Sequence, residues 1–337
     1  MTVSIIIAVK NWQKNLEDCV GKCLELDYPD FEILILPDKS FIKYIPHNEK
    51  TSYKIIPTGP VSPADKRDMA LEHAEGEILA FIDDDAYPAK DWLKNAVENF
   101  KDANVAAVGG PAITPPEDSF SQVASGIVYS SMIVSGNFTY RYLPKKRGEI
   151  DDYPSCNLLV RKSVMTELGG FNTEFWPGED TKLCLDIVKK LKKKIIYEPT
   201  AIVYHHRRPL FSAHLDQISS YALHRGYFVK RYPETSLKLA YFLPTILLAS
   251  LVGGAVIVFY SAIFANIYFT CIAFYLSLVA ILGVFSIPEK ISAGLTLRKK
   301  IGMMAMVSAG IVLSHLYYGF YFLFGLLSPK LKEENIV

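Results

Sequence analysis

Three consecutive aspartates, Asp83, Asp84 and Asp85, follow the apolar run EILAFI of residues 77–82. Carboxylates this close repel one another, and a buried acid tends to take up a proton rather than stay charged. A divalent cation would offset the repulsion, because Mg²⁺ and Mn²⁺ prefer oxygen ligands. The structural alternative is a solvated turn in which one of the aspartates caps the next helix. Both interpretations fit these three residues taken alone.

Apolar runs and amphipathic segments alternate through the first 110 residues and would position the aspartates. This alternation predicts an α/β fold with a mostly parallel sheet and helices on both faces. Ligands bind such sheets at the carboxyl ends of the strands, where Asp38 and the three aspartates lie. The expected strands are 3–9, 31–36, 52–57, 77–83 and 105–110, and the expected helices are 15–26, 63–76 and 90–100.

The C-terminal third has a different composition from the rest of the 337-residue chain. Residues 239–288 contain no charged side chain, and residues 301–329 contain none apart from the titratable His315. A helix that spans a bilayer needs about 20 apolar residues. The net charge of +1 gives no indication of nucleic-acid binding. We therefore expect a membrane region of about three helices, at 239–260, 263–287 and 301–327.

Cysteine usage and basic loops bear on localisation. An odd count of five cysteines without a pairing pattern fits a reducing compartment. Basic residues between the second and third apolar stretches favour a cytoplasmic loop. We thus expect a multi-pass protein of the cell (inner) membrane with its N-terminal region in the cytoplasm. Three spans would put the tail outside; its Lys330 and Lys332 argue against this, and a re-entrant third segment remains an alternative.

Four segments together carry a resemblance to a known family. In order, they are SIIIAVKNWQKNL, FEILILPDKS, ADKRDMALEHAEGEILAFIDDDAYP and SCNLLVRKSVMTELGGFNTEFWPGEDTKLCLDI. Their order and spacing resemble the family-2 glycosyltransferases of GT-A fold over about residues 3–230. The resemblance implies a GT-A catalytic domain at 1–211. We expect an amphipathic interfacial helix at 212–236, a transmembrane region at 237–329 and a tail at 330–337.

The resemblance also implies roles for the aspartate cluster. In the family, an Asp-x-Asp pattern binds a nucleotide sugar through Mn²⁺ or Mg²⁺, and here it matches Asp83 and Asp85. Asp85 is expected to contact the metal directly, and Asp83 to face the ribose or a water bound to the metal, so both are candidate metal-site residues. Asp84 lies between them in the donor site and points away if the strand alternation continues. His205, in the segment AIVYHHRRPLF, is a candidate third metal ligand, or it touches the diphosphate.

Other donor contacts follow from the same resemblance. The segment ILILPDKS resembles the family's strand end at which an Asp contacts the base or the ribose, and here that residue is Asp38. The family usually has a second acid just before this Asp, where this chain has Pro37. Backbone groups in the first strand and its loop are expected to hold a uracil, with guanine as an alternative. Lys66 and Arg67 match a basic pair before the metal strand, although both also suit a solvated helix face. The residues expected in the first loop are Ala8, Val9 and Asn11.

The motif WPGEDTKLCLDI resembles the Glu-Asp motif of the family, whose Asp is the general base. Inverting transfer needs one carboxylate to take the proton of the acceptor hydroxyl. Asp180 fits this role, and Glu179 would assist or orient it. Asp is also a favoured helix cap, so a structural role is the alternative. Candidate contacts to phosphate or acceptor are Trp176, His206, Arg207 and Arg208, although the two arginines could instead meet lipid head groups.

These observations predict a membrane-anchored, metal-dependent, inverting glycosyltransferase. The expected partners are a nucleotide sugar, with UDP favoured, and a lipid-linked polyprenyl acceptor used in surface glycan or glycoprotein assembly. One rival is a transferase onto polyprenyl phosphate itself. A processive polysaccharide synthase would carry Gln-x-x-Arg-Trp, whereas Gln217 is followed by ISSY. A non-catalytic nucleotide-sugar-binding module would be expected to lose one of the two acidic motifs.

Overall fold

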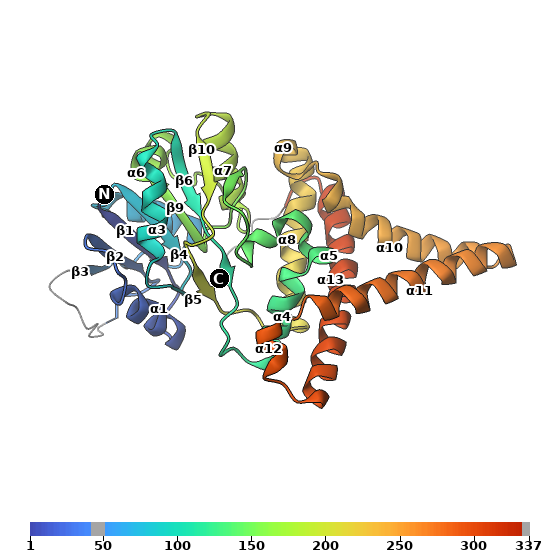
Figure 1. Ribbon diagram of the computed structural model, residues 1–337. Coiled ribbons are helices and arrows are strands. Elements are labelled where there is room, and N and C mark those ends of the chain that lie inside the picture. Colours follow the sequence, from blue (N-terminus) through green and yellow to red (C-terminus); the bar gives the residue numbers. More distant parts are fainter. Residues whose placement is uncertain (42–50, 332–337) are drawn as a thin grey trace. The chain divides into compact units, whose positions relative to one another are not determined.

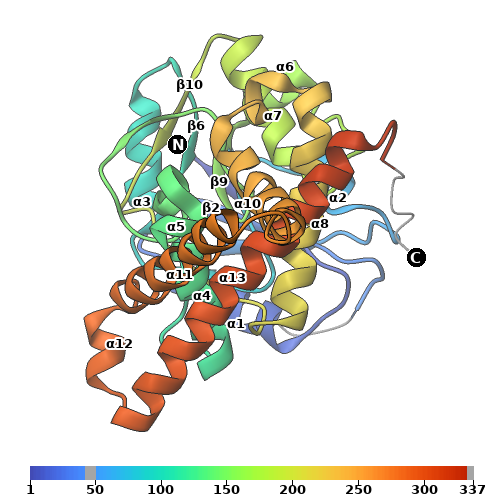
Figure 2. The same ribbon diagram turned by 90° about the vertical axis from the view of Figure 1, so that its right-hand side faces the viewer.

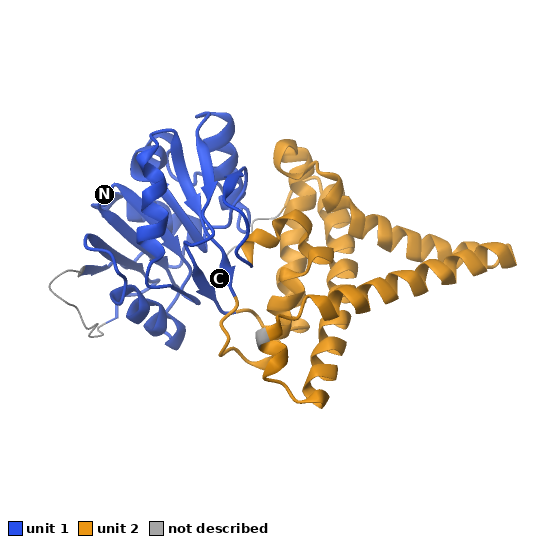
Figure 3. Ribbon diagram, in the orientation of Figure 1, with its two compact units in different colours: residues 1–113, 143–206, 332–337 blue, residues 114–142, 207–331 orange. Residues whose placement is uncertain are grey.

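A computed structural model describes residues 1–41 and 51–331 of the chain (Figure 1). The described residues form two compact units, coloured separately in Figure 3. Unit 1 comprises residues 1–113 and 143–206, and unit 2 comprises residues 114–142 and 207–331. The sequence predicts one catalytic domain over residues 1–211. In the structure, the helical segment 114–142 lies within those bounds but belongs to unit 2, together with the C-terminal helices.

Unit 1 is built on an eight-stranded mixed sheet of order β3-β2-β1-β4-β9-β6-β10-β8. The first four of these strands are parallel, with Val3 opposite both Phe31 and Ile78. The apolar runs of β1, β2 and β4 make these three buried strands, as the sequence predicts, whereas the edge strand β3 is partly exposed. The strands are β1 (Val3–Ala8), β2 (Phe31–Leu36), β3 (Thr51–Ile55), β4 (Ile78–Ile82), β6 (Val105–Gly109), β8 (Gly148–Ile150), β9 (Asn157–Arg161) and β10 (Lys194–Tyr197).

Strand β9 interrupts a sheet that is otherwise mostly parallel, as the sequence predicts. It lies between β4 and β6 and runs antiparallel to both. Asn157, the first residue of β9, holds two neighbouring loops. Its side-chain amide donates hydrogen bonds to the carbonyl oxygens of Gly110 at 2.6 Å and Ala201 at 2.9 Å. The indole of Trp92 donates back to the Asn157 oxygen at 2.8 Å. This buried amide therefore ties the sheet to α3.

In the described part of unit 1, seven short helices lie around the sheet. Serine capping starts α2, where Ser62 Oγ accepts from the backbone of Asp65 at 3.1 Å. The helix expected over 63–76 is shorter in the structure, because α2 ends at Met69 and the chain then turns toward β4. In this turn Gly76 passes close to β1: a Cβ on Gly76 would lie 2.4 Å from the Ser4 nitrogen. The helices are α1 (Lys14–Leu24), α2 (Pro63–Met69), η1 (Ala70–Glu72), α3 (Trp92–Val97), η2 (Glu98–Lys101), α6 (Lys162–Leu168) and α7 (Glu179–Lys189).

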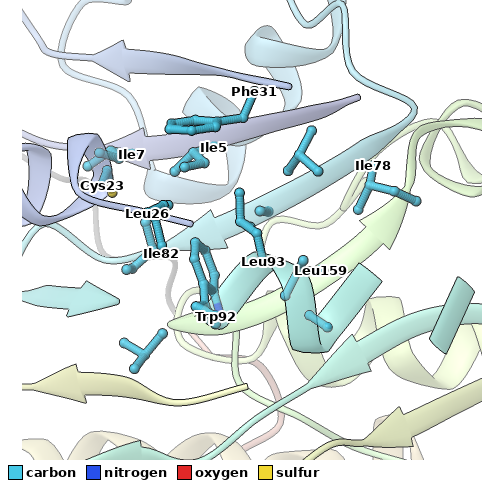
Figure 4. Close-up of a cluster of buried hydrophobic side chains, with 14 of the residues drawn as sticks. Ile5, Ile7, Cys23, Leu26, Phe31, Ile78, Ile82, Trp92, Leu93 and Leu159 are labelled. Atoms are coloured by element: carbon cyan, nitrogen blue, oxygen red, sulfur yellow. The ribbon is translucent and has the colours of Figure 1, made fainter. Parts of the chain in front are cut away.

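The main core of unit 1 lies on one face of the sheet. Figure 4 shows Ile5 and Ile7 of β1 together with Trp92 and Leu93 of α3 and Leu159 of β9. Each of these side chains is fully buried. Burying such a side chain contributes about 1.5–3 kcal/mol. This packing fixes the strands whose carboxyl ends carry the candidate site.

A second, three-stranded sheet of order β5-β11-β7 completes unit 1. Strand β5 (Ala86–Pro88) immediately follows the aspartate cluster, and β7 is Ala112–Ile113. Strand β11 (Val203–His205) runs antiparallel to β5, with His205 opposite Ala86. This pairing brings the histidine motif to the aspartates.

Unit 2 is entirely helical. Three of its helices are long and apolar enough to cross a membrane: α10 (Leu239–Ile257), α11 (Ala262–Phe285) and α13 (Leu297–Leu327). Helix α8 (Ser212–Arg231) lies beside α13 in both views (Figures 1 and 2), and its Lys230 donates to the Ser328 carbonyl at 2.6 Å. The other helices are α4 (Phe120–Ser130), α5 (Met132–Ser135), η3 (Gly136–Arg141), α9 (Pro233–Ser236) and α12 (Glu289–Ala293).

Candidate active site

The aspartate cluster and the histidine motif meet in unit 1. Asp83 and Asp85 follow the carboxyl end of β4, and His205 ends β11. The His205 Nε2 atom lies 3.0 Å from Asp85 Oδ1. One potential ligand atom from each of these three residues lies within 4.8 Å of the others. Two carboxylates and an imidazole at this spacing fit a divalent cation such as Mn²⁺, so the three predicted metal ligands do come together.

Asp84 is held outside this group of three. Its carboxylate accepts a hydrogen bond from the side chain of Gln13, at the start of α1. Burial, and then the negative charge of Asp85, raise the pKa of Asp84 to about 6, although the bond from Gln13 opposes the rise. Gln13 was not singled out from the sequence, since nothing in its surroundings there indicates a partner 71 residues away.

Arg67 connects the two acidic motifs. Its Nη2 atom lies 2.9 Å from Asp83 Oδ1, and its Nη1 atom lies 2.9 Å from Glu179 Oε1. The guanidinium is buried, with only 5% of its side chain exposed. A buried charge requires partners of opposite sign, and the fork of Arg can serve two at once. Arg67 thus orients side chains of the site; its contact with the donor stays a prediction.

Lys66 connects the ends of β1 and β2. Its ammonium donates to the carbonyl oxygens of Val9 at 2.6 Å and Leu36 at 3.3 Å, and it pairs with Asp38. Lys66 is buried, so it does not lie on the solvated face that was the alternative from sequence. Three predicted donor-binding residues, Val9, Asp38 and Lys66, therefore lie together at the carboxyl ends of neighbouring strands.

The Glu179–Asp180 pair opens α7. Glu179 is buried, which raises its pKa, while the charge of Arg67 opposes the rise. Asp180 is partly exposed, and its carboxylate accepts from the backbone N–H groups of Thr181 at 2.7 Å and Ser155 at 3.3 Å. These donors orient the carboxylate, and its partial exposure leaves it accessible to an acceptor. The geometry suits an orienting Glu179 and a reactive Asp180.

The remaining predicted residues have different environments. In unit 1, Asn11 and Trp176 are exposed, Ala8 is partly buried, and the His206 ring lies 5.7 Å from that of Tyr87. Arg207 and Arg208 belong to unit 2. Arg207 is buried there, with its guanidinium carbon 5.2 Å from the centre of the Tyr142 ring, and its Nε donates to Thr114 Oγ1 at 3.3 Å. Arg208 is exposed.

Comparisons with known proteins bear directly on this site. Residues 4–169 match the model of the family described as glycosyl transferase family 2. Over 146 residues the chain is 30% identical to the pre-mycofactocin glycosyltransferase of Mycobacterium tuberculosis, covering 43% of this chain but only 30% of that protein. Over 244 residues it is 24% identical to the dolichyl N-acetyl-alpha-D-glucosaminyl phosphate 3-beta-D-2,3-diacetamido-2,3-dideoxy-beta-D-glucuronosyltransferase of Methanococcus voltae, covering 68% of this chain and 74% of that one.

A solved structure shares the fold. The mannosyltransferase of Pyrobaculum calidifontis, solved with GDP-Man and Mn²⁺, aligns with a TM-score of 0.52 at 16% identity, covering 97% of this chain and 88% of that one. The first relative is matched over less than a third of its length, so its whole activity does not transfer to this chain. The family match, the strand-end aspartates and the shared GT-A fold lead to one conclusion: residues 4–169 of this chain form a domain of glycosyl transferase family 2.

Proposed function

We propose that this chain is a membrane-anchored, metal-dependent, inverting glycosyltransferase that transfers a sugar from a nucleotide-sugar donor to a lipid-linked acceptor. The observation that carries the proposal is the connection between the two acidic motifs. Arg67 bridges Asp83 of the candidate metal group and Glu179, the neighbour of the candidate base Asp180. Donor activation and proton removal would thus share one rigid set of side chains in unit 1.

The residues present fit a divalent cation, which would be held by Asp83, Asp85 and His205. When bound, the cation supplies positive charge against the nucleoside diphosphate leaving group. Asp180 accepts the proton of the acceptor hydroxyl while that oxygen forms a bond to the anomeric carbon and the bond from this carbon to the diphosphate breaks. Attack opposite the leaving group inverts the anomeric configuration. Arg67 and Glu179 position Asp83 and Asp180 without taking part in proton transfer.

A lipid-linked acceptor, of the polyprenyl class, is supported by two observations. The described part of the chain contains three helices that are apolar and long enough to cross a membrane. The Methanococcus voltae relative is named as acting on a dolichyl-linked sugar phosphate. On this proposal the enzyme is a multi-pass protein of the inner membrane with unit 1 in the cytoplasm. UDP is the expected nucleotide, and a binding panel of UDP and GDP tests that assignment separately from the chemistry.

The base assignment is tested by Asp180→Asn. The rate of sugar transfer from a radiolabelled nucleotide sugar to extractable lipid should fall by roughly 10²-fold or more, because a general base contributes about 10²–10⁴-fold to the rate. Nucleotide binding, measured by calorimetry, should remain close to wild type. The matched control is Asp91→Asn, an exposed aspartate of unit 1 that should leave both readouts unchanged. Loss of nucleotide binding in Asp180→Asn, or retained transfer, would contradict the assignment.

The metal group is tested by Asp85→Ala and His205→Ala. Both should weaken Mn²⁺-stimulated binding of UDP, or of whichever nucleotide binds in the panel, because each removes a ligand. Asp91→Ala serves as the control. The readout is nucleotide affinity with Mn²⁺ and with a chelator, so it does not depend on finding the sugar or the acceptor. Unchanged affinity in both variants, together with transfer that resists the chelator, would rule out the metal role.

A further inference from the structure

The three apolar helices of unit 2 differ in how far protein covers them. We compare the most apolar 18 residues of each helix. Protein buries none of these residues in α10, 11% of them in α11 and 39% of them in α13. An apolar helix surface without protein cover is stable only where hydrocarbon surrounds it. By this measure α10 and α11 are lipid-facing helices, whereas α13 is a packed one.

Helices α10 and α11 form a hairpin that contacts α13 only near its base. Thr245 Oγ1 donates to the Gly319 carbonyl at 2.9 Å, and Tyr275 Oη lies 2.9 Å from His315 Nδ1. Farther along, Tyr268 Oη donates to the Leu251 carbonyl at 2.9 Å and holds the two helices to each other. Beyond the base the hairpin projects away from α13 (Figure 1), and exposed apolar side chains there include Val256, Ile257, Phe259, Tyr260, Phe264 and Phe269.

The hairpin has the dimensions of two membrane spans. Its helices contain 19 and 24 residues. At 1.5 Å per residue, these are about 29 Å and about 36 Å long, against a hydrocarbon core of about 30 Å. The turn of residues 258–261 carries no charge, whereas the charged residues Lys238 and Glu289 flank the hairpin at its base. The hairpin can therefore cross and return without moving a charge through the bilayer.

Helix α13 is accompanied by α8 along its C-terminal half. His214 Nε2 lies 2.9 Å from Ser314 Oγ, and Lys230 donates to the Ser328 carbonyl at 2.6 Å. The two backbones approach closely between these points, because a Cβ on Gly325 would lie 2.0 Å from the Leu223 oxygen. If α13 crossed the bilayer, α8 would be drawn to the same depth.

The charges of α8 and of the ends of α13 argue against such a crossing. Asp216, Lys230 and Arg231 on α8 are exposed, and charged side chains are costly at membrane depth. Basic residues stand at both ends of α13: Arg298, Lys299 and Lys300 at its start, and Lys330 just beyond its end. Positive segments stay on the cytoplasmic side, so both ends of α13 belong on one side.

We propose that the chain crosses the bilayer only through the α10–α11 hairpin, and that α13 lies with α8 along the membrane surface on the side of the catalytic unit. Its exposed apolar side chains, such as Ile301, Phe320, Phe324 and Leu327, then face the lipid. No crossing segment separates α8 from unit 1, so residue 330 and unit 1 share one side. This inference rests on the membrane anchoring in the proposed function, but not on sugar transfer.

The test is cysteine accessibility in the full-length chain. The exposed Cys271 is replaced by serine, and single cysteines are introduced as Asp91→Cys, Lys299→Cys, Tyr260→Cys and Lys330→Cys. The same background without an added cysteine measures labelling of the four buried native cysteines. Sealed membrane vesicles of known orientation are treated with a membrane-impermeant maleimide before and after permeabilisation. Labelling is independent of activity, so a failed transfer assay leaves this test intact.

We expect Lys330→Cys and Lys299→Cys to label from the same side as Asp91→Cys, and Tyr260→Cys to label only from the opposite side. A three-span chain gives the same result at positions 260 and 299, so position 330 distinguishes the two arrangements. Labelling of Lys330→Cys from the side of Tyr260→Cys overturns the proposal. So does labelling of Tyr260→Cys from the side of Asp91→Cys, or its failure to label after permeabilisation, because the hairpin then does not cross.

Discussion

The two units bury polar side chains in different ways. Among the described residues, unit 1 buries six charged side chains, and unit 2 buries one, Arg207. The other buried polar residues of unit 2 are serines, threonines and histidines, such as His214, which lies between Ser125 and Ser314 at 2.8 and 2.9 Å. The buried charged residues of unit 1 are Glu32, Lys66, Arg67, Asp152, Glu179 and Asp186.

Under the proposed function, this difference separates catalysis in unit 1 from membrane anchoring in unit 2. A site that handles a diphosphate and moves a proton requires charges, and unit 1 keeps them buried by pairing opposite signs, as Arg67 does with Asp83 and Glu179. Packed helices beside a membrane satisfy their polar groups with neutral hydrogen bonds, because a charge in hydrocarbon is costly. We therefore expect mutations to act through unpaired charge in unit 1 and through packing or protonation in unit 2.

The largest effect is expected for Arg67→Leu, which breaks the charge pairing of unit 1. It leaves Glu179 buried without its partner, and breaking such a pair costs about 3–5 kcal/mol. All three tryptophans, Trp12, Trp92 and Trp176, lie in unit 1, so tryptophan fluorescence during urea unfolding follows this unit selectively. The measured quantity is the free energy of unfolding of the full chain in detergent.

The matched control for this variant is Arg147→Leu. The Arg147 side chain is 56% exposed and lies 3.4 Å from Glu198, so its loss should cost about 0–1 kcal/mol. Arg67→Lys is a second comparison: it keeps the charge, but an ammonium lacks the fork that reaches both carboxylates. Equal, small losses in Arg67→Leu and Arg147→Leu would show that the bridge does not stabilise unit 1.

In unit 2 the expected effect comes from protonation of His214. Burial lowers the pKa of His214 to about 4, below its value in the unfolded chain of about 6.5. The folded unit therefore favours the neutral ring: its stabilisation is complete above pH ~6.5 and declines as the pH falls toward 4. At 1.36 kcal/mol per pKa unit, the loss approaches ~3 kcal/mol.

Calorimetric melting of wild type and His214→Asn between pH 7 and pH 4.5 measures this effect. The variant should be less stable at pH 7 but lose less stability on acidification. His73→Asn, at an exposed histidine of unit 1, is the control and should follow the wild-type pH dependence. If His214→Asn melts with the wild-type pH dependence, the buried histidine does not link unit 2 to pH.

Much of the candidate site was accessible from sequence because it depends on local patterns. Apolar runs indicate buried strands, and residues that follow such strands meet at one edge of a parallel sheet. This reasoning placed Asp83 and Asp85 correctly at the end of a strand. It also placed His205 at the end of another strand, and His205 lies 3.0 Å from Asp85 in the structure. The donor and base roles of these side chains remain predictions that the proposed variants test.

Long-range pairings were not accessible in the same way. Arg67 and Glu179 are 112 residues apart, and nothing local in either segment specifies the other. The run NLLVR has the pattern of a strand, but its antiparallel place between β4 and β6 depends on the whole sheet. Likewise, the apolar face of α4 does not reveal that Val123 and Ile127 pack with Met303 and Val307 of α13. Periodicity identifies an element, whereas its partner is decided by the folded chain.

The smallest expected effect concerns the packing of α13. A Cβ on Gly325 would lie 2.0 Å from the Leu223 oxygen of α8, whereas nothing lies within 4 Å of a Cβ on Gly302. Gly325→Ala should therefore destabilise unit 2 by about 1–3 kcal/mol through overpacking. Gly302→Ala, in the same helix, should be neutral or gain about 0.5–1 kcal/mol from helix propensity. Melting of both variants at pH 7 measures the difference; equal stabilities would mean that α8 does not hold α13 closely, and would remove the packing argument for a surface-lying α13.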